Sequence, residues 1–296
     1  MKRSYKAILK ILFWTQFRKR AHRLFLNPPR GTRPLAPYSF PGSQKPEAWT
    51  VDGSRLLTLS GDPPVRAHVI FLPGGAYIVE ATPFHRAFAE KLAKTPGLSV
   101  TLIDYPKSPE HTYQAAHDLV REAYHQLRDR YPDQEICLLG DSAGGGLALA
   151  FQASLRDQGI TPLPRRIALI SPWLDLSLSH PEIPAYSNRD PILPLEGLRY
   201  AADLYAGGAD LKDPALSPLF GDLNGLGEIL LVFGTEEIFY PDCLDLIARI
   251  EGARGTRLAW EVGKDLIHAW PLFPFPESAP ALERIAQFLL GKWTPD

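Results

Sequence analysis

The sequence predicts an α/β fold, with helices on both faces of a mostly parallel β-sheet. The first observation is alternation, because short apolar runs typical of buried strands are followed repeatedly by amphipathic helical runs. The second is composition: 45% of the 296 residues are hydrophobic and 22% are charged, which indicates a globular chain rather than a disordered or fibrous one. The third is the clustering of 23 glycines and 29 prolines between the apolar runs, as in loops.

The expected strands are short, and most of their residues are apolar. Ala67–Leu72 is typical, because it is a continuous run that stops at Pro73-Gly74-Gly75, as a strand buried in a parallel sheet does. In chain order, the eight expected strands are Trp49–Val51, Leu56–Leu59, Ala67–Leu72, Leu98–Tyr105, Glu135–Leu139, Arg166–Ser171, Glu228–Phe233 and Arg257–Val262.

The expected helices lie between these strands. Pro83 stands at the start of one of them, where the fixed φ of proline suits the first turn. The alternation breaks once, at Trp173–Leu216, which is rich in Pro, Ser and Asp and is predicted to be an insertion between two strands. In chain order, the expected helices are Pro83–Lys94, Tyr113–Tyr131, Ser142–Asp157, Leu195–Tyr205 within the insertion, Asp242–Glu251 and Ala279–Leu290.

The N-terminal arm is basic and the rest of the chain is acidic. Residues 1–46 hold eleven Lys and Arg and no acid, whereas the remainder has 21 basic and 33 acidic residues. Residues 4–25 have the apolar spacing of an amphipathic helix. Residues 1–25 could therefore lie on an anionic membrane surface, or the helix could pack on the protein itself, which we favour. The overall net charge of −1 gives no basic field for nucleic acid.

Three further features concern compartment and cofactors. No uncharged apolar run is long enough to span a membrane, and the run Ala7–Phe17 is interrupted by Lys10 with no small-residue cleavage site after it. We therefore expect a retained N-terminus and a cytoplasmic protein. Cys137 and Cys243 cannot form a disulfide framework, and nothing in the sequence implies a metal or an organic cofactor.

The clearest chemical motif is Gly140-Asp141-Ser142-Ala143-Gly144, a Gly-x-Ser-x-Gly pattern. It follows an apolar strand run and opens a helical run, which is the strand–turn–helix context in which a serine becomes an exposed nucleophile. A plain glycine turn is the alternative. As a nucleophile, Ser142 would have the Ala143 N–H beside it at the helix start, where it can stabilise an oxyanion. Gly74 and Gly75, after an earlier strand, are the expected second source of oxyanion donors.

A nucleophilic serine needs a base and an acid to orient that base. His268 lies in Lys264–Trp270, expected to be a loop between the last strand and the last helix, where sites form in such sheets. The acid should follow the preceding strand, where three carboxylates compete. Glu237 is preferred, with Asp242 and Glu236 as alternatives.

Four stretches, in order, resemble the hormone-sensitive-lipase-like family of α/β-hydrolases, the bacterial carboxylesterases. Gly140–Gly145 resembles the family's nucleophile motif, and Asp104–His111 resembles its Asp-Tyr-Arg-Leu-Ala-Pro-Glu-His segment. Pro73–Tyr77 resembles the His-Gly-Gly-Gly oxyanion loop, with Pro73 in place of His, and Ile267–Ala269 resembles the segment with the catalytic histidine. Glu237 stands where the family usually has Asp.

The resemblance implies an α/β-hydrolase fold with an eight-stranded sheet and a helical cap. On this basis residues 1–47 form N-terminal cap helices and a linker, residues 48–172 and 217–296 form the core, and residues 173–216 form a cap insertion. It also implies hydrolysis of small to medium acyl esters through an acyl-enzyme. Alternatives are a deacetylase or amidase, a ligand-binding homologue without turnover, and a peripheral membrane protein. An exposed edge strand or the last helix could pair two copies in a homodimer. The residues considered for the substrate pocket are Tyr77, Asp141, Trp173 and Tyr205, together with Trp14, Phe17, Phe25 and Tyr186.

Overall fold

The computed structural model describes residues 18–31, 40 and 45–293 and contains an eight-stranded sheet in the order β1-β2-β4-β3-β5-β6-β7-β8. The pairs β1–β2 and β2–β4 are antiparallel, and all other neighbouring pairs are parallel. The strands are β1 (Glu47–Val51), β2 (Ser54–Leu59), β3 (Ala67–Leu72), β4 (Leu98–Ile103), β5 (Glu135–Asp141), β6 (Arg166–Ile170), β7 (Gly227–Glu236) and β8 (Thr256–Ile267).

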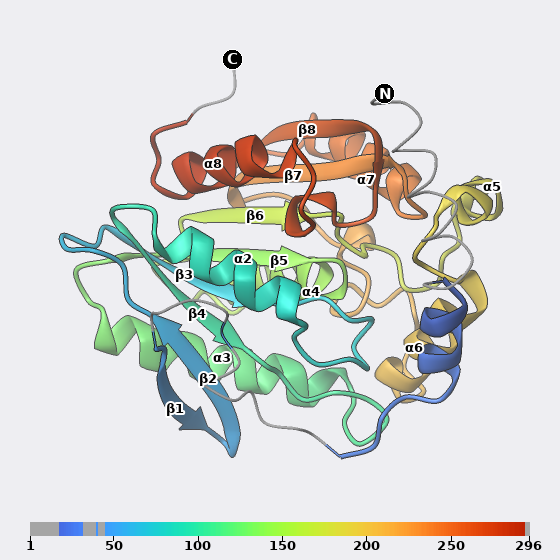
Figure 1. Cartoon of the computed structure of the whole chain (residues 1–296), viewed down its shortest axis with the longest axis horizontal. Coiled ribbons are helices and arrows are strands. Elements are labelled where there is room, and N and C mark those ends of the chain that lie inside the picture. Colours follow the sequence, from blue (N-terminus) through green and yellow to red (C-terminus); the bar gives the residue numbers. More distant parts are fainter. Residues whose placement is uncertain (1–17, 32–39, 41–44, 294–296) are drawn as a thin grey trace.

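Helices cover both faces of this sheet (Figure 1). One face carries α2 (Pro83–Ala93) and α8 (Ser278–Leu289), with the short 3-10 helix η3 (Trp270–Leu272) between them. The other carries α3 (Tyr113–Arg130), α4 (Ala143–Asp157) and α7 (Tyr240–Ile250). The α/β-hydrolase fold class expected from the sequence is confirmed, with a mostly parallel sheet between two helical layers.

The central strands are buried on both sides, which explains their apolar runs. Every residue of β3, β4 and β6 is buried. Among the polar residues in these strands is His68 on β3, whose ring nitrogens lie 2.7 Å from the hydroxyls of Ser99 and Thr101 on β4. Burial lowers the pKa of His68 to about 3, so this histidine is a neutral part of the core.

Two sequence expectations require correction. The last strand was expected to end at Val262, but β8 continues to Ile267, so Lys264–Ile267 belong to the strand rather than to a loop. Charged residues are tolerated there because β8 is an edge strand, open to solvent on one side. The insertion also contains a helix that no apolar pattern predicted, α5 (Ile183–Arg189), of which only Ile183 and Ser187 are buried.

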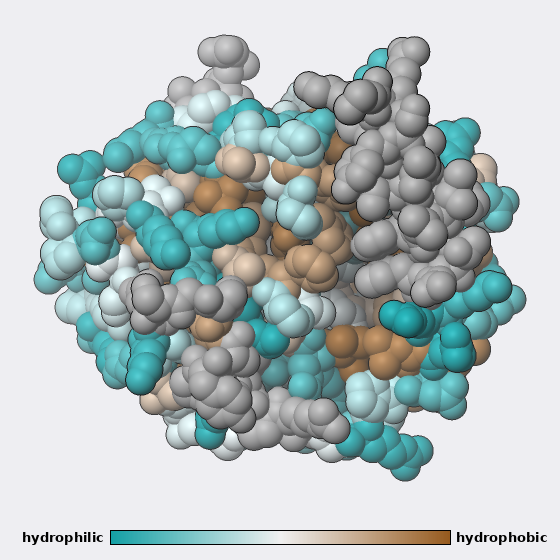
Figure 2. Space-filling view, in the orientation of Figure 1, coloured by the Kyte–Doolittle hydropathy of each residue, from teal (hydrophilic) through white to brown (hydrophobic). Residues whose placement is uncertain are grey.

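The insertion lies at the carboxyl end of the strands, where α5 and α6 (Leu195–Ala206) stand beside the arrowheads of β5 and β6 (Figure 1). Residues 18–26 are helical and pack on it, because a Cβ at Gly197 of α6 would lie 2.8 Å from Phe25 Cβ. The described part of the basic arm therefore contacts the protein itself. Residues 1–17, including Trp14 and Phe17, lie outside the described residues. Figure 2, in the orientation of Figure 1, shows apolar surface in the middle of the view and at its lower right.

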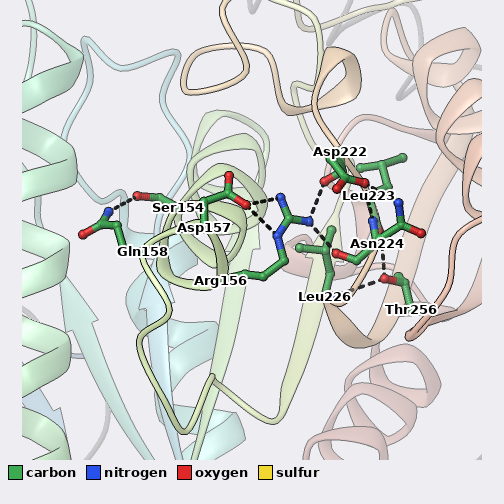
Figure 3. A network of polar contacts seen from close by, with 9 residues as sticks. All are labelled: Ser154, Arg156, Asp157, Gln158, Asp222, Leu223, Asn224, Leu226 and Thr256. Carbon is green, nitrogen blue, oxygen red and sulfur yellow. Dashed lines mark hydrogen bonds and ion pairs between the residues drawn. The ribbon is translucent and has the colours of Figure 1, made fainter.

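At the opposite end of the sheet, Arg156 connects α4 to the turn that precedes β7 (Figure 3). Its guanidinium donates to the backbone oxygens of Asp222, at 2.7 Å, and Asn224. It also pairs with Asp157 at 2.6 Å. This network fixes one end of α4, while the other end begins at Ser142.

Candidate active site

Ser142 occupies a strained turn between β5 and α4. Its φ of 52° and ψ of −124° lie outside the helical and strand regions, and Ala143 is the first helical residue. The turn requires small neighbours: a Cβ on Gly140 would lie 2.3 Å from Gly144 O, and one on Gly144 would lie 2.0 Å from Leu72 O. Among the described residues, Ser142 Oγ forms no hydrogen bond, so its contact to a base is not closed in this structure.

His268 and Glu237 lie at the same edge of the sheet as Ser142. Ser142, Glu237 and His268 follow β5, β7 and β8 respectively, and these strands are parallel. His268 Nδ1 lies 3.9 Å from Glu237 Oε1, which is longer than a hydrogen bond. Both atoms are buried and have no hydrogen-bond partner among the described residues, so each is the natural complement of the other.

The environment favours a charged imidazole at position 268. Burial alone would lower the pKa of His268, but the nearby carboxylate of Glu237, together with the charges of Asp190 and Asp141, raises it above 6.5. The imidazolium formed when a base accepts a proton is therefore stabilised at this position.

The other two candidate acids are placed differently. Asp242 lies on α7, and both of its carboxylate oxygens are buried without a partner among the described residues. Burial holds the pKa of Asp242 well above its ordinary range, which favours the uncharged form of that carboxyl. Glu236 is half-buried in β7, where it pairs in register with Ile267. Of the three, Glu237 is the carboxylate that faces His268.

In the loop after β3, one of the expected oxyanion donors is wrong. The Gly74 N–H donates to Asp141 Oδ1 at 3.0 Å, so it is not available to a substrate. In the described structure the N–H groups of Gly75 and Ala76 have no partner, and neither does that of Ala143 at the start of α4. A Cβ on Gly74 would lie 2.9 Å from Ser142 Cβ, so this loop runs beside the nucleophile. Sequence reasoning missed Ala76.

A buried network holds this loop in place. Asp141, which we expected in the substrate pocket, instead lies with Oδ1 on Gly74 N–H and Oδ2 3.0 Å from His85 Nε2. His85 Nδ1 accepts the Thr82 N–H at 2.9 Å, so its other nitrogen can donate to Asp141. Tyr105 adds a second support by donating its hydroxyl to Pro73 O at 2.7 Å.

Aromatic side chains pack next to the reacting groups. Tyr77 stacks on Tyr205 of α6 with ring centroids 3.6 Å apart, and Trp173 stacks on Phe239. Phe239 in turn packs edge-on against His268, at 5.3 Å. Three of the expected pocket residues, Tyr77, Trp173 and Tyr205, thus belong to one cluster beside the site.

Two other candidates for the pocket wall lie elsewhere. Tyr186 stacks on Tyr240, and Phe25 packs against α6 at Gly197. Neither has a ring contact with the cluster around His268 in the part of the chain that the structure describes.

Asp190 links the insertion to the segment that carries Glu237. It is fully buried, and its Oδ2 accepts the N–H of Ile238, the residue after Glu237, at 2.9 Å. Its Oδ1 accepts the N–H groups of Ile192 and Leu193. Sequence reasoning missed Asp190, and its position between α5 and α6 gave no signal in the sequence.

The comparisons with known proteins identify the family. A family model described as the alpha/beta hydrolase fold matches residues 69–272. This chain belongs to the α/β-hydrolase family. An acetyl-hydrolase of Streptomyces hygroscopicus is 34% identical over 75% of this chain and 74% of its own length, and an esterase of Acinetobacter venetianus is 32% identical over 74% and 73%.

Solved α/β-hydrolases place the chain among hormone-sensitive-lipase relatives, as its motifs suggested. An esterase from the bacterial hormone-sensitive lipase family is 30% identical with a TM-score of 0.79, covering 92% of this chain and 96% of that one. The homologue EstE7, from a metagenome library, is 27% identical with a TM-score of 0.82, covering 98% of both chains.

Two further features of this α/β-hydrolase concern membranes and metals. Within residues 18–31, 40 and 45–293, no helix is both long and apolar enough to cross a bilayer. In the same ranges, no three His, Cys, Asp or Glu side chains are grouped in a way that could hold a metal ion.

Proposed function

We propose that this chain is a carboxylesterase in which Ser142 is the nucleophile, His268 the general base and Glu237 the acid that orients His268. The observation that carries the proposal is the convergence of these three residues at one edge of the sheet, with the buried Glu237–His268 pair and a strained serine turn. Unpartnered N–H groups beside Ser142 complete what acyl transfer requires.

The reaction has two halves. Ser142 Oγ attacks the ester carbonyl while His268 takes the hydroxyl proton, and the negative charge that develops on the carbonyl oxygen is held by the N–H groups of Gly75, Ala76 and Ala143. His268 then returns the proton to the leaving alcohol, and an acyl ester remains on Ser142. A water molecule activated by His268 attacks this ester, releasing the carboxylic acid and regenerating the serine.

A small to medium acyl group fits the surroundings of Ser142. Ser142 and His268 are only 6% and 5% exposed, and the aromatic cluster of Tyr77, Trp173 and Tyr205 reaches His268 through Phe239. A relative that is 34% identical is named an acetyl-hydrolase, which supports a short acyl chain. The same name supports the second candidate, a deacetylase or amidase acting through the same residues. Comparing turnover of an acetyl ester with that of the matching acetyl amide separates the two.

The direct test is Ser142→Ala, assayed on p-nitrophenyl esters of graded acyl length. We expect kcat to fall by at least about 10⁴-fold, because the residue that forms the covalent bond is gone. Labelling by a fluorophosphonate should disappear as well. The matched control is Ser154→Ala, on the same helix, whose hydroxyl accepts a hydrogen bond from the exposed Gln158 side chain. Full ester hydrolysis by Ser142→Ala would refute the proposal, and absence of both turnover and labelling in the wild type would favour a binding protein.

A further inference from the structure

Ser171 follows β6 and lies completely buried between the candidate acid and the candidate base. Its hydroxyl donates to Glu237 Oε2 at 2.7 Å and accepts the N–H of Ala269, the residue after His268, at 3.0 Å. The residue before Ser171 also contacts the nucleophile turn, because the Ser142 N–H donates to the carbonyl of Ile170 at 2.9 Å. One hydroxyl thus connects the segments that carry acid and base.

The bonds to Glu237 decide which carboxylate oxygen faces the imidazole. Oε2 is occupied by Ser171 and by the Gly234 N–H at 3.0 Å, whereas Oε1 has no hydrogen-bond partner in the described part of the chain and is the oxygen that lies 3.9 Å from His268 Nδ1. A glutamate has one more rotatable bond than an aspartate, so its carboxylate needs more external support to hold one orientation. The Ser171 hydroxyl supplies part of that support.

The bond to Ala269 acts on the backbone next to the base. Ser171 and Ala269 have φ values of 46° and 52°, a region that residues with side chains rarely adopt. Strained conformations persist where surrounding contacts hold them in place. The hydrogen bond between these two residues is such a contact, and it fixes the direction in which the chain leaves His268.

We propose that Ser171 is a positioning residue of the triad, whose hydroxyl both turns Glu237 Oε1 toward His268 and fixes the peptide that follows His268. The proposal rests on the proposed function, because it assigns Ser171 a role only if Glu237 and His268 act as acid and base. Among the described residues, the Ser171 hydroxyl bonds to Glu237 and to the Ala269 N–H, and to neither the Ser142 hydroxyl nor the His268 ring.

The experiment compares Ser171→Ala, Ser171→Gly and Ser171→Cys on p-nitrophenyl acetate, after Ser142→Ala has been shown to abolish hydrolysis. If Ser142→Ala stays active, the proposed function itself fails, whatever the Ser171 variants do. The glycine variant removes the hydroxyl and also relieves the positive φ, so it should fold even if the alanine variant does not. The cysteine variant keeps a weaker donor and acceptor.

For the alanine and glycine variants we expect kcat to fall about 10- to 100-fold with KM within about twofold of wild type. The acidic limb of the kcat/KM profile should move to lower pH, because His268 loses part of its alignment with Glu237. The cysteine variant should lie between these and the wild type.

Ser217→Ala is the matched control. Ser217 is equally buried, accepts the Leu176 N–H and donates to Leu211 O, but has no bond to Glu237 or His268. It should lower the melting temperature while kcat and the acidic limb stay as in the wild type. The proposal is overturned if either hydroxyl-free Ser171 variant keeps kcat within threefold of wild type, or if kcat falls while the acidic limb does not move.

Discussion

Single residues around Ser142 show unusual backbone strain. Eight non-glycine residues in the described part of the chain have positive φ, and five of them lie at the candidate site: Ala76, Tyr77, Ser142, Ser171 and Ala269. Each such conformation costs on the order of 1–3 kcal/mol and persists only where its surroundings hold it. At Ala269 the Ser171 hydroxyl supplies part of that restraint, and at Ser142 and Ser171 backbone hydrogen bonds to Ile170 O and Val232 O do so.

The pKa of His268 predicts the pH dependence of turnover. The base must be neutral to accept a proton, and its pKa is raised above 6.5 in the free enzyme, chiefly by Glu237 against the opposing effect of burial. We therefore expect kcat/KM to fall as the pH drops, with a midpoint above pH 6.5. A pH profile on an uncharged ester measures this midpoint. A midpoint below pH 6 would contradict the charged environment assigned to His268.

Asp141 predicts how the oxyanion loop depends on its support. In Asp141→Asn one of the two donors, Gly74 N–H or His85 Nε2–H, would face an amide NH₂ in place of an oxygen. We expect kcat to fall about 10- to 100-fold, with KM changed by less than about twofold, because the transition-state donors lose alignment.

The control for this change is Asp118→Asn, on the exposed side of α3, where the carboxylate pairs with Arg121. It should leave steady-state kinetics unchanged. An Asp141→Asn enzyme with wild-type kcat would show that the loop holds its shape without this network.

At the scale of whole elements, the Arg156 network holds α4 to the turn before β7, away from the catalytic edge (Figure 3). Arg156→Ala removes a partly buried guanidinium and leaves two backbone oxygens without their donor. We expect the free energy of unfolding to fall by about 1–3 kcal/mol while kcat/KM stays within about twofold of wild type. Urea denaturation measures the first quantity, with the exposed Arg199→Ala as control. A loss of activity without a loss of stability would mean that this end of α4 communicates with Ser142.

The stability of the whole molecule should depend on pH through two core histidines. Burial lowers the pKa of His68 to about 3 and that of His117 to about 4, whereas both are near 6.5 in the unfolded chain. Between these values the unfolded state binds more protons at these two histidines, so their contribution to the free energy of unfolding is greatest above pH 6.5 and falls as the pH drops. Each histidine adds about 1.4 kcal/mol per pH unit to the slope between roughly pH 6 and pH 4.5.

Denaturation curves at several pH values test this in wild type, His68→Gln and His117→Gln. Each variant should have a shallower decline toward acid than the wild type. Equal slopes in all three proteins would show that these histidines do not control acid stability.

Much of the molecule could be predicted from the sequence, for identifiable reasons. The strand–turn–helix context located Ser142, and the position of His268 after the last strand followed from the alternation of elements. The direction of a backbone N–H is invisible in a sequence, which is why Gly74 was expected as an oxyanion donor while Ala76 was not. Ser171 was missed because a serine that ends a strand has no pattern of its own, and only the tertiary structure brings it to Glu237.

The bond from Asp190 to the Ile238 N–H has a consequence for engineering. The segment between Trp173 and Leu216 is an obvious part to exchange between relatives in order to change the accepted esters. Because Asp190 lies in that segment and accepts the N–H of the residue after Glu237, a chimera with a foreign insertion would alter proton transfer as well as the choice of ester. Grafts that keep an aspartate at this point should retain turnover better than those that lose it.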